Sequence, residues 1–265
     1  MKNPSVFDDR RPATAVFTQF QRHPILSAAG LFAFDLLLGA FSGIVAKKLL
    51  PQADPAFVAM CVLAVVIAGL LTLLGWWREA GFNGPGHWRE LRLLWLPAVV
   101  AIVLPLFGGF KQVDTNMVIY LTVGYLITGF MEEAWVRGLI LRVLQPVGPV
   151  RAVLISALLF ALLHTNNFLF RNPAIVLAQM VGAFCFGVAF GALRLRTNTL
   201  WFVIALHMLH DLLLHLSGFP TIPLNVVQDV ILLIYGIYLL RGMRNVIPSG
   251  GSSDADHQSS PQLVG

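Results

Sequence analysis

The sequence predicts an all-α membrane protein with about eight transmembrane helices in a single domain. Its 265 residues are 57% hydrophobic and only 12% charged, and the mean hydropathy is +0.76. Soluble globular proteins carry about 25% charged residues, so the composition excludes an ordinary soluble domain. The apolar residues also gather in runs of about 17–25, the length at which a helix crosses a bilayer.

The predicted helices follow one another with short breaks. Turn-forming residues mark these breaks, among them Pro51 and Pro55, the GFNGPG stretch at 81–86, Gln145-Pro146 and Asn172-Pro173. The eight expected spans are 25–46, 57–77, 93–109, 117–144, 150–164, 174–193, 200–216 and 226–240. We therefore expect one transmembrane domain over 25–244, preceded by a cytoplasmic segment over 1–24. The Ser- and Gly-rich end of the chain predicts a disordered tail over 245–265.

Lysine and arginine residues are divided unevenly between the two sides of this topology. With a cytoplasmic N-terminus, 13 of the 18 basic residues lie in cytoplasmic segments, four lie in outer loops, and Arg137 lies within a span. Because cytoplasmic loops are enriched in Lys and Arg, we expect both termini in the cytoplasm and the protein in the plasma (inner) membrane. The same loops account for the net charge of +5, so we expect a lipid bilayer and no nucleic acid as partner.

Three charged residues interrupt the fourth span, namely Glu132, Glu133 and Arg137. Each such residue at the centre of a membrane helix costs roughly 2.5–3.5 kcal/mol on insertion scales, so the cluster must be shielded. Glu133 and Arg137 are four residues apart and share a helix face, whereas Glu132 is turned about 100° away. We expect Arg137 to neutralise Glu133 and Glu132 to remain available for chemistry. The alternative is that both glutamates only make packing hydrogen bonds.

Two further spans contribute polar side chains. His164 ends the fifth span, and His207 and Asp211 lie four residues apart on one face of the seventh. A single histidine at a helix end is more often structural than reactive, and we expect neighbouring His210 and His215 to be packing or interfacial residues. A carboxylate with two histidines suits activation of water, with one histidine holding the water and the other stabilising an oxyanion. Peptide hydrolysis is a reaction that suits this set of catalytic groups.

These residues resemble three ordered motifs of a known protein family. Glu132-Glu133-x-x-x-Arg137, Phe160-x-x-x-His164 and His207-x-x-x-Asp211 are similar to the motifs of the type II CAAX prenyl endopeptidases. That family belongs to the wider group of CAAX proteases and bacteriocin-processing proteins (CPBP). The motif region runs from about 117 to 215. The resemblance implies an intramembrane endopeptidase that acts on a peptide or a membrane-associated protein substrate, prenylated or not, near the cytoplasmic membrane face.

The resemblance also implies a role for each residue. Glu132 and His164 would hold the hydrolytic water, His207 and Asp211 would form the oxyanion site, and Glu133 with Arg137 would support Glu132. Asp211 departs from the pattern, because the family commonly has Asn there. An ionised Asp would repel an oxyanion, so we expect Asp211 to orient and charge His207 instead.

Two questions remain open from sequence. Glu132, His164 and His207 could ligate zinc with one open position, although a glutamate and a histidine that bind water need no metal, and we expect a metal-free site. The same polar cluster would also serve a proton-coupled transporter or a non-catalytic membrane scaffold. We find no internal repeat of the kind that transporters often carry.

Overall fold

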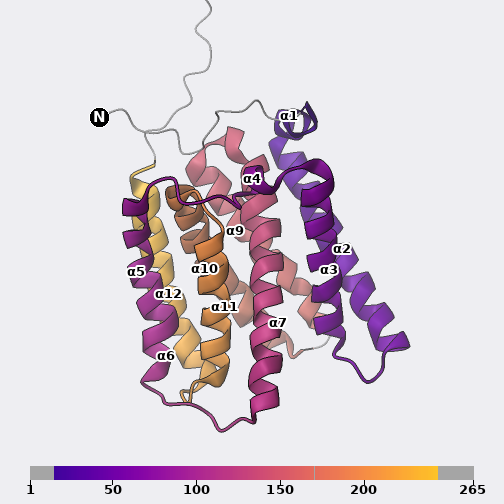
Figure 1. Cartoon of the computed structure of the whole chain (residues 1–265), viewed down its shortest axis with the longest axis vertical. Coiled ribbons are helices and arrows are strands. Elements are labelled where there is room, and N and C mark those ends of the chain that lie inside the picture. The colour runs from indigo at the N-terminus through magenta and orange to yellow at the C-terminus, as the bar shows by residue number, and fades with distance from the viewer. Residues whose placement is uncertain (1–14, 170, 244–265) are drawn as a thin grey trace, which may run out of the picture.

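The structure, a computed structural model, describes residues 15–169 and 171–243, and these residues are almost entirely helical (Figure 1). No strand occurs in this part of the chain, apart from an isolated bridge between Phe110 and Ser217. The helices run up and down along the long axis of the molecule. The all-α membrane fold is confirmed. The predicted tail 245–265 and the first 14 residues of the predicted segment 1–24 lie outside the described residues.

Six helices are long and apolar enough to cross a membrane among the residues described. They are α2 (Pro24–Leu49), α3 (Pro55–Leu74), the segment Thr115–Val143, the segment Pro149–Leu169, α10 (Pro173–Thr197) and α12 (Thr221–Arg241). Thr115–Val143 comprises α7 (Thr115–Glu133), a π-helical stretch η3 (Ala134–Ile140) and α8 (Leu141–Val143). Pro149–Leu169 comprises α9 (Pro149–Leu163) and the 3₁₀ turn η5 (His164–Leu169).

The other two predicted spans are shorter or irregular. α11 (Trp201–Leu216) is apolar but has only 16 residues. The predicted span 93–109 corresponds to a broken helix: η1 (Trp88–Leu94, 3₁₀), α5 (Trp95–Ala98), η2 (Val99–Val103, π) and α6 (Leu104–Leu106). Pro97 and Pro105 lie within it, and proline removes a backbone donor and distorts the helix around it. The short helices α1 (Ala15–Arg22) and α4 (Trp77–Ala80) and the turn η4 (Gln145–Val147) complete the described elements.

Local sequence explains where the long helices begin. Asp54 accepts a hydrogen bond from the Ala56 amide at 2.9 Å, and Asp114 accepts one from the Met117 amide at 3.0 Å. Asn172 caps α10 in the same way, and proline follows immediately at the first helical position. These caps fix the register with which each helix enters the bundle.

α10 lies at the centre of the bundle, packed against α9 and α12. Glycines allow this close approach. A Cβ atom at Gly187 would lie 2.9 Å from Ala157 of α9, and one at Gly236 would lie 2.8 Å from the Ala189 backbone. In a membrane, burial of apolar surface contributes little to helix association, because lipid chains are also apolar. Close packing through small residues contributes instead. The tight packing places Phe186 of α10 beside both Phe160 of α9 and His207 of α11.

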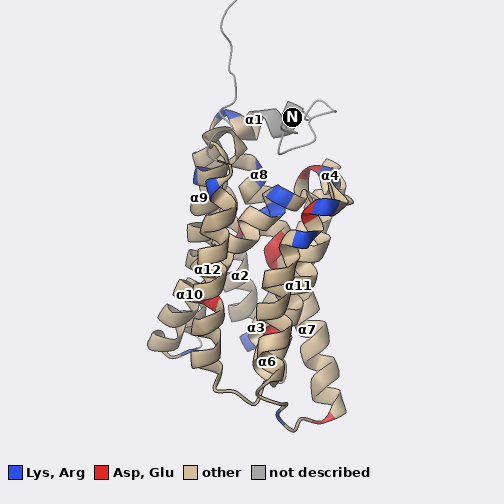
Figure 2. Cartoon of the chain, turned by 90° about the vertical axis from the view of Figure 1, so that its left-hand side faces the viewer, with Lys and Arg blue, Asp and Glu red and all other residues tan. Residues whose placement is uncertain are grey.

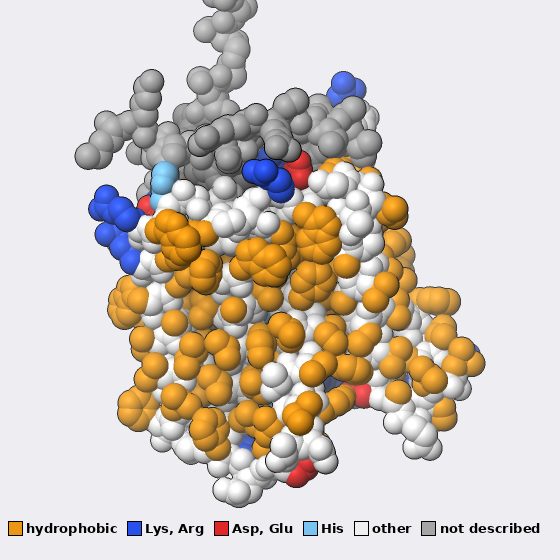
Figure 3. Space-filling view, in the orientation of Figure 1, with side chains coloured by type: hydrophobic (Ala, Val, Ile, Leu, Met, Phe, Trp, Pro, Cys, Tyr) orange, Lys and Arg blue, Asp and Glu red, His pale blue; other side chains and the backbone are white. Residues whose placement is uncertain are grey.

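Charge and hydrophobicity follow the pattern of a membrane protein. Figure 2 shows most Lys and Arg at the end of the molecule where α1, α4 and α8 lie. The described chain begins and ends there, as an even number of crossings requires. Hydrophobic side chains cover most of the face in Figure 3. Large apolar residues exposed on the described chain include Leu73, Val181 and Ile234. The protein is therefore an integral membrane protein, and the cytoplasmic orientation of its basic end stays a prediction.

Candidate active site

The Glu-Glu-Arg cluster lies where α7 changes into a π-helix. Glu132 and Glu133 are the last residues of α7, and Arg137 lies in the π-helical stretch Ala134–Ile140. π-Helical turns occur frequently at functional sites because the wider turn redirects side chains. One turn earlier, a Cβ atom at Gly129 would lie 3.1 Å from the Ile204 oxygen. Gly129 thus lets α7 and α11 approach each other just below the cluster.

Glu133 and Arg137 form the predicted ion pair. Arg137 Nη1 lies 3.1 Å from Glu133 Oε1, and the two side chains are 1% and 0% exposed. The guanidinium carbon of Arg137 also lies 4.1 Å from the centre of the Phe160 ring on α9. A cation over a desolvated aromatic ring is attracted by the ring quadrupole. The carboxylate and the ring therefore share the task of stabilising a buried positive charge.

His207 of α11 lies among three carboxylates. Its Nδ1 lies 2.8 Å from Glu133 Oε1, while its Nε2 lies 3.5 Å from both Glu132 Oε2 and Asp211 Oδ2. An ionised carboxylate only accepts hydrogen bonds, so Nδ1 carries a proton that it donates to Glu133. The 3.5 Å distances are too long for strong hydrogen bonds. Nε2 is thus held near two carboxylates without being tightly bound to either.

His164 is oriented by its own helix. Its Nδ1 lies 3.0 Å from the Phe160 carbonyl oxygen, and because a carbonyl only accepts, Nδ1 donates. In the neutral imidazole this leaves a lone pair on Nε2. His164 begins the 3₁₀ turn η5, which follows α9 directly. The helix end therefore fixes the tautomer and leaves one nitrogen free to accept a hydrogen bond.

Phe160 links the three helices. Its ring lies over Arg137, meets the His164 ring edge-on at 5.0 Å between centroids, and meets the His207 ring edge-on at 6.3 Å. His164 has no hydrogen bond or ion pair with Glu132 in the described part of the chain. The structure thus brings Arg137, His164 and His207 around one aromatic ring. His207 in turn lies within 3.5 Å of the three carboxylates of Glu132, Glu133 and Asp211.

Exposure separates the cluster into an inner and an outer part. The Glu132 side chain is 20% exposed and that of Asp211 is 27% exposed, whereas Glu133 and Arg137 are fully buried. The outer carboxylates can meet water or substrate. The inner pair can act only through its neighbours.

Sequence reasoning missed the contact between Glu133 and His207. We expected Asp211, four residues from His207 on α11, to be the carboxylate that orients His207. Instead, Glu133 makes the close contact at 2.8 Å from a different helix. Spacing within one helix gives no signal for such a contact. Phe186 of α10, whose ring lies 4.7 Å from that of His207, was missed for the same reason.

The two histidines expected to be packing or interfacial residues make contacts of that kind. His210 is 4% exposed and lies against Phe186, with ring centroids 5.3 Å apart. His215 Nδ1 lies 3.1 Å from the Tyr125 hydroxyl at the far end of α11.

The alternative zinc site was tested against the arrangement of donors. Across residues 15–169 and 171–243, no group of three or more His, Cys, Asp or Glu side chains is arranged to hold a metal ion. Glu132, His164 and His207 do not converge in that way. The nitrogen of His207 that would ligate the metal lies between two carboxylates. The metal-free site therefore stays a prediction.

Comparison with known proteins supports the resemblance that the motifs suggested. Residues 114–213 match the family model described as "Type II CAAX prenyl endopeptidase Rce1-like". The matched region contains Glu132, Glu133, Arg137, His164, His207 and Asp211. No curated protein matches the sequence. The resemblance is therefore confirmed for the region that carries the site.

Proposed function

We propose that this protein is an intramembrane endopeptidase that hydrolyses a peptide bond with a water activated by Glu132. The observation that carries the proposal is the convergence of Arg137 of η3, His164 of η5 and His207 of α11 around Phe160. The family match over residues 114–213 covers the same three segments and favours protease activity. Ionisable side chains inside a membrane are costly, which favours a functional role for the cluster.

Glu132 is the group best suited to act as general base. It is the more exposed of the two glutamates, and Arg137 is occupied by Glu133. His164 Nε2, with its lone pair, would accept one hydrogen bond from the water while Glu132 takes the other proton. The resulting hydroxide attacks the peptide carbonyl carbon. Glu132 then returns the proton to the departing amine, so that a carboxylate and an amine leave the site.

His207 is the group best suited to stabilise the oxyanion. Its Nδ1 donates to Glu133, so a protonated imidazole has an Nε2–H available for the developing negative charge. Glu133 favours the charged form of His207 and fixes its ring, while Arg137 prevents excess negative charge at Glu133. Asp211, at 3.5 Å from Nε2, would orient and charge His207 from the opposite side. Glu133 and Arg137 are therefore positioning residues.

We further propose that the reaction needs no metal. Glu132 would supply the base, His164 the hydrogen-bond acceptor that holds the water, and His207 the donor to the oxyanion. These three functions are sufficient for the reaction. Activity that survives metal chelation supports this proposal. Loss of activity on chelation, restored by zinc, would contradict it.

The site would act near the cytoplasmic side of the membrane on a membrane-associated protein or peptide. Glu132 lies 17 residues beyond the start of α7 and 11 residues before the end of α8 at the basic end, so it lies in the half nearer that end. The positive-inside rule assigns the basic end to the cytoplasm. A prenylated substrate is one form that the family match favours.

Comparison of cleaved C-termini across the proteome tests the proposal in cells. Cells that carry the wild type should contain shortened C-termini that are absent with Glu132→Gln, and Glu79→Gln serves as a control outside the cluster. Identical C-termini in cells with the wild type, Glu132→Gln and Glu79→Gln would contradict the proposal. Proton flux into vesicles that depends on Glu132 without any proteolysis would support a transporter instead.

A further inference from the structure

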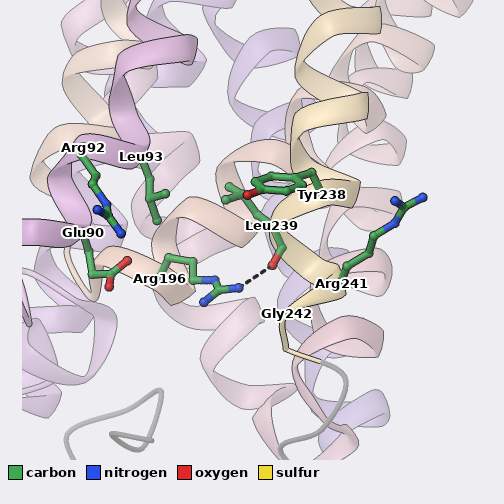
Figure 4. A pocket seen from close by; sticks show the side chains of 8 residues that line it. All are labelled: Glu90, Arg92, Leu93, Arg196, Tyr238, Leu239, Arg241 and Gly242. Atoms are coloured by element: carbon green, nitrogen blue, oxygen red, sulfur yellow. Dashed lines mark hydrogen bonds between the residues drawn. The ribbon is translucent and has the colours of Figure 1, made fainter. Parts of the chain in front are cut away.

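A second polar site lies at the basic end of the molecule, apart from the three-helix cluster. A pocket of about 410 Å³ forms where η1 begins and where α10 and α12 end. Small-molecule sites commonly have volumes of about 300–1,000 Å³. The polar and terminal residues that line it are Glu90, Arg92, Arg196, Tyr238, Arg241 and Gly242 (Figure 4). We call it the arginine pocket.

The arginine pocket carries an excess of positive charge. Three arginines and one glutamate line it, and none of the three arginines forms an ion pair with an Asp or Glu of the described chain. Figure 4 shows Arg92 and Glu90 reaching toward Arg196, whereas Arg241 points away from it. Arginine is suited to bind phosphate because its planar group presents several donors at once. The charge therefore favours an anionic ligand with several acceptor oxygens.

Arg196 is held in place in advance. Its Nη2 donates to the Leu239 carbonyl oxygen at 2.9 Å, and a Cβ atom at Gly242 would collide with the same nitrogen. Its Nε is buried and has no hydrogen-bond partner among the described residues. A buried donor without an acceptor is costly, so it indicates a missing partner. The neighbouring wall is also fixed, because the Tyr235 hydroxyl donates to the Leu93 carbonyl oxygen at 2.7 Å.

An apolar stripe leads from the pocket along the outer face of α12. Val230, Ile234 and Tyr238 are four residues apart and are 51%, 64% and 65% exposed. Residues at this spacing share one face of a helix, and this face would contact lipid chains. A ligand with a charged phosphate and acyl chains fits both the arginine pocket and the apolar face of α12. We propose that the arginine pocket binds the phosphate of an anionic phospholipid whose chains lie along α12.

Lipid binding to the purified full-length protein in a neutral detergent tests this proposal. Native mass spectrometry would measure binding of phosphatidylglycerol and phosphatidylcholine, with inorganic phosphate as a soluble competitor. We expect phosphatidylglycerol to bind roughly tenfold more tightly than phosphatidylcholine, and inorganic phosphate to compete only weakly. Arg196→Gln and Arg92→Gln should each weaken phosphatidylglycerol binding roughly five- to tenfold. Glu90→Gln should strengthen it, because repulsion of the phosphate is removed.

Arg151→Gln is the matched control, because Arg151 is an exposed arginine at the start of α9 and does not line the pocket. Its lipid binding should equal that of the wild type. Arg92 is also exposed and its side chain has no described partner, so Arg92→Gln tests the site even if Arg196→Gln does not fold. Unchanged lipid preference in Arg92→Gln would overturn the proposal. If inorganic phosphate competed as strongly as phosphatidylglycerol binds, the lipid assignment would be overturned and a soluble phosphate ligand indicated.

Discussion

Replacement of Arg137 with Met should strongly destabilise the fold, because it leaves the Glu133 charge buried and unpaired. Arg137 Nη1 lies 3.1 Å from Glu133, both side chains are buried, and the guanidinium carbon lies 4.1 Å from the Phe160 ring centre. Removal of one partner from a buried ion pair costs about 3–5 kcal/mol. Methionine fills much of the apolar volume of the arginine stem, so a cavity contributes little of this loss.

Thermal unfolding in detergent measures this effect. A change of 1 kcal/mol shifts the Tm of a protein of this size by about 2–4 °C, so we expect a fall of roughly 6–20 °C for Arg137→Met. The double variant Glu133→Gln with Arg137→Met removes both charges and should unfold at a higher temperature than the single variant. Arg151→Met, at an exposed position, is the control. The reasoning is refuted if Arg137→Met melts within about 2 °C of the wild type, or if the double variant melts below the single one.

Three further substitutions test the site by peptide cleavage. Gly129→Leu should lower activity at least tenfold, because a Cβ atom there already lies 3.1 Å from the Ile204 oxygen. Gly124→Leu on the same helix should remain active, because a Cβ atom at Gly124 lies 3.8 Å from its nearest neighbour, the Phe57 ring. Full activity in Gly129→Leu would contradict the close approach of α7 and α11. Asp211→Asn should keep kcat within about tenfold of the wild type, since an amide can also support the oxyanion site; a loss of about a hundredfold would mean that the carboxylate itself is required. His164→Gln should lower kcat roughly a hundredfold with little change in Tm, and an unchanged kcat would remove His164 from the water site.

Sequence alone predicted most of the membrane helices, because each is a long apolar run between turn-forming residues. The predicted span 117–144 corresponds to the helical segment Thr115–Val143, and 174–193 lies within α10. The segment 93–109 was predicted less well. Its composition is apolar, but Pro97 and Pro105 interrupt regular hydrogen bonding, and hydropathy does not register that interruption.

The candidate site was predictable only as far as contacts within single helices. The four-residue spacing identified the pair of Glu133 with Arg137, which the structure confirms at 3.1 Å. The contact of Glu133 with His207 depends on how α7 crosses α11, and Gly129 sets that crossing through backbone approach. Single-sequence periodicity contains no information on such crossings. The motif resemblance supplied the grouping of the three helices but not the geometry among them.

Cleavage of a peptide substrate by the purified protein tests the central claim, that Glu132 activates the hydrolytic water. The substrate would be one whose shortened C-terminus the cellular comparison identifies, and Glu132→Gln would be compared with the wild type and with Glu79→Gln. We predict that Glu132→Gln lowers kcat by about 10²–10⁴-fold, the usual contribution of a general base, while its Tm stays near that of the wild type. Wild-type cleavage by a folded Glu132→Gln variant would contradict the claim.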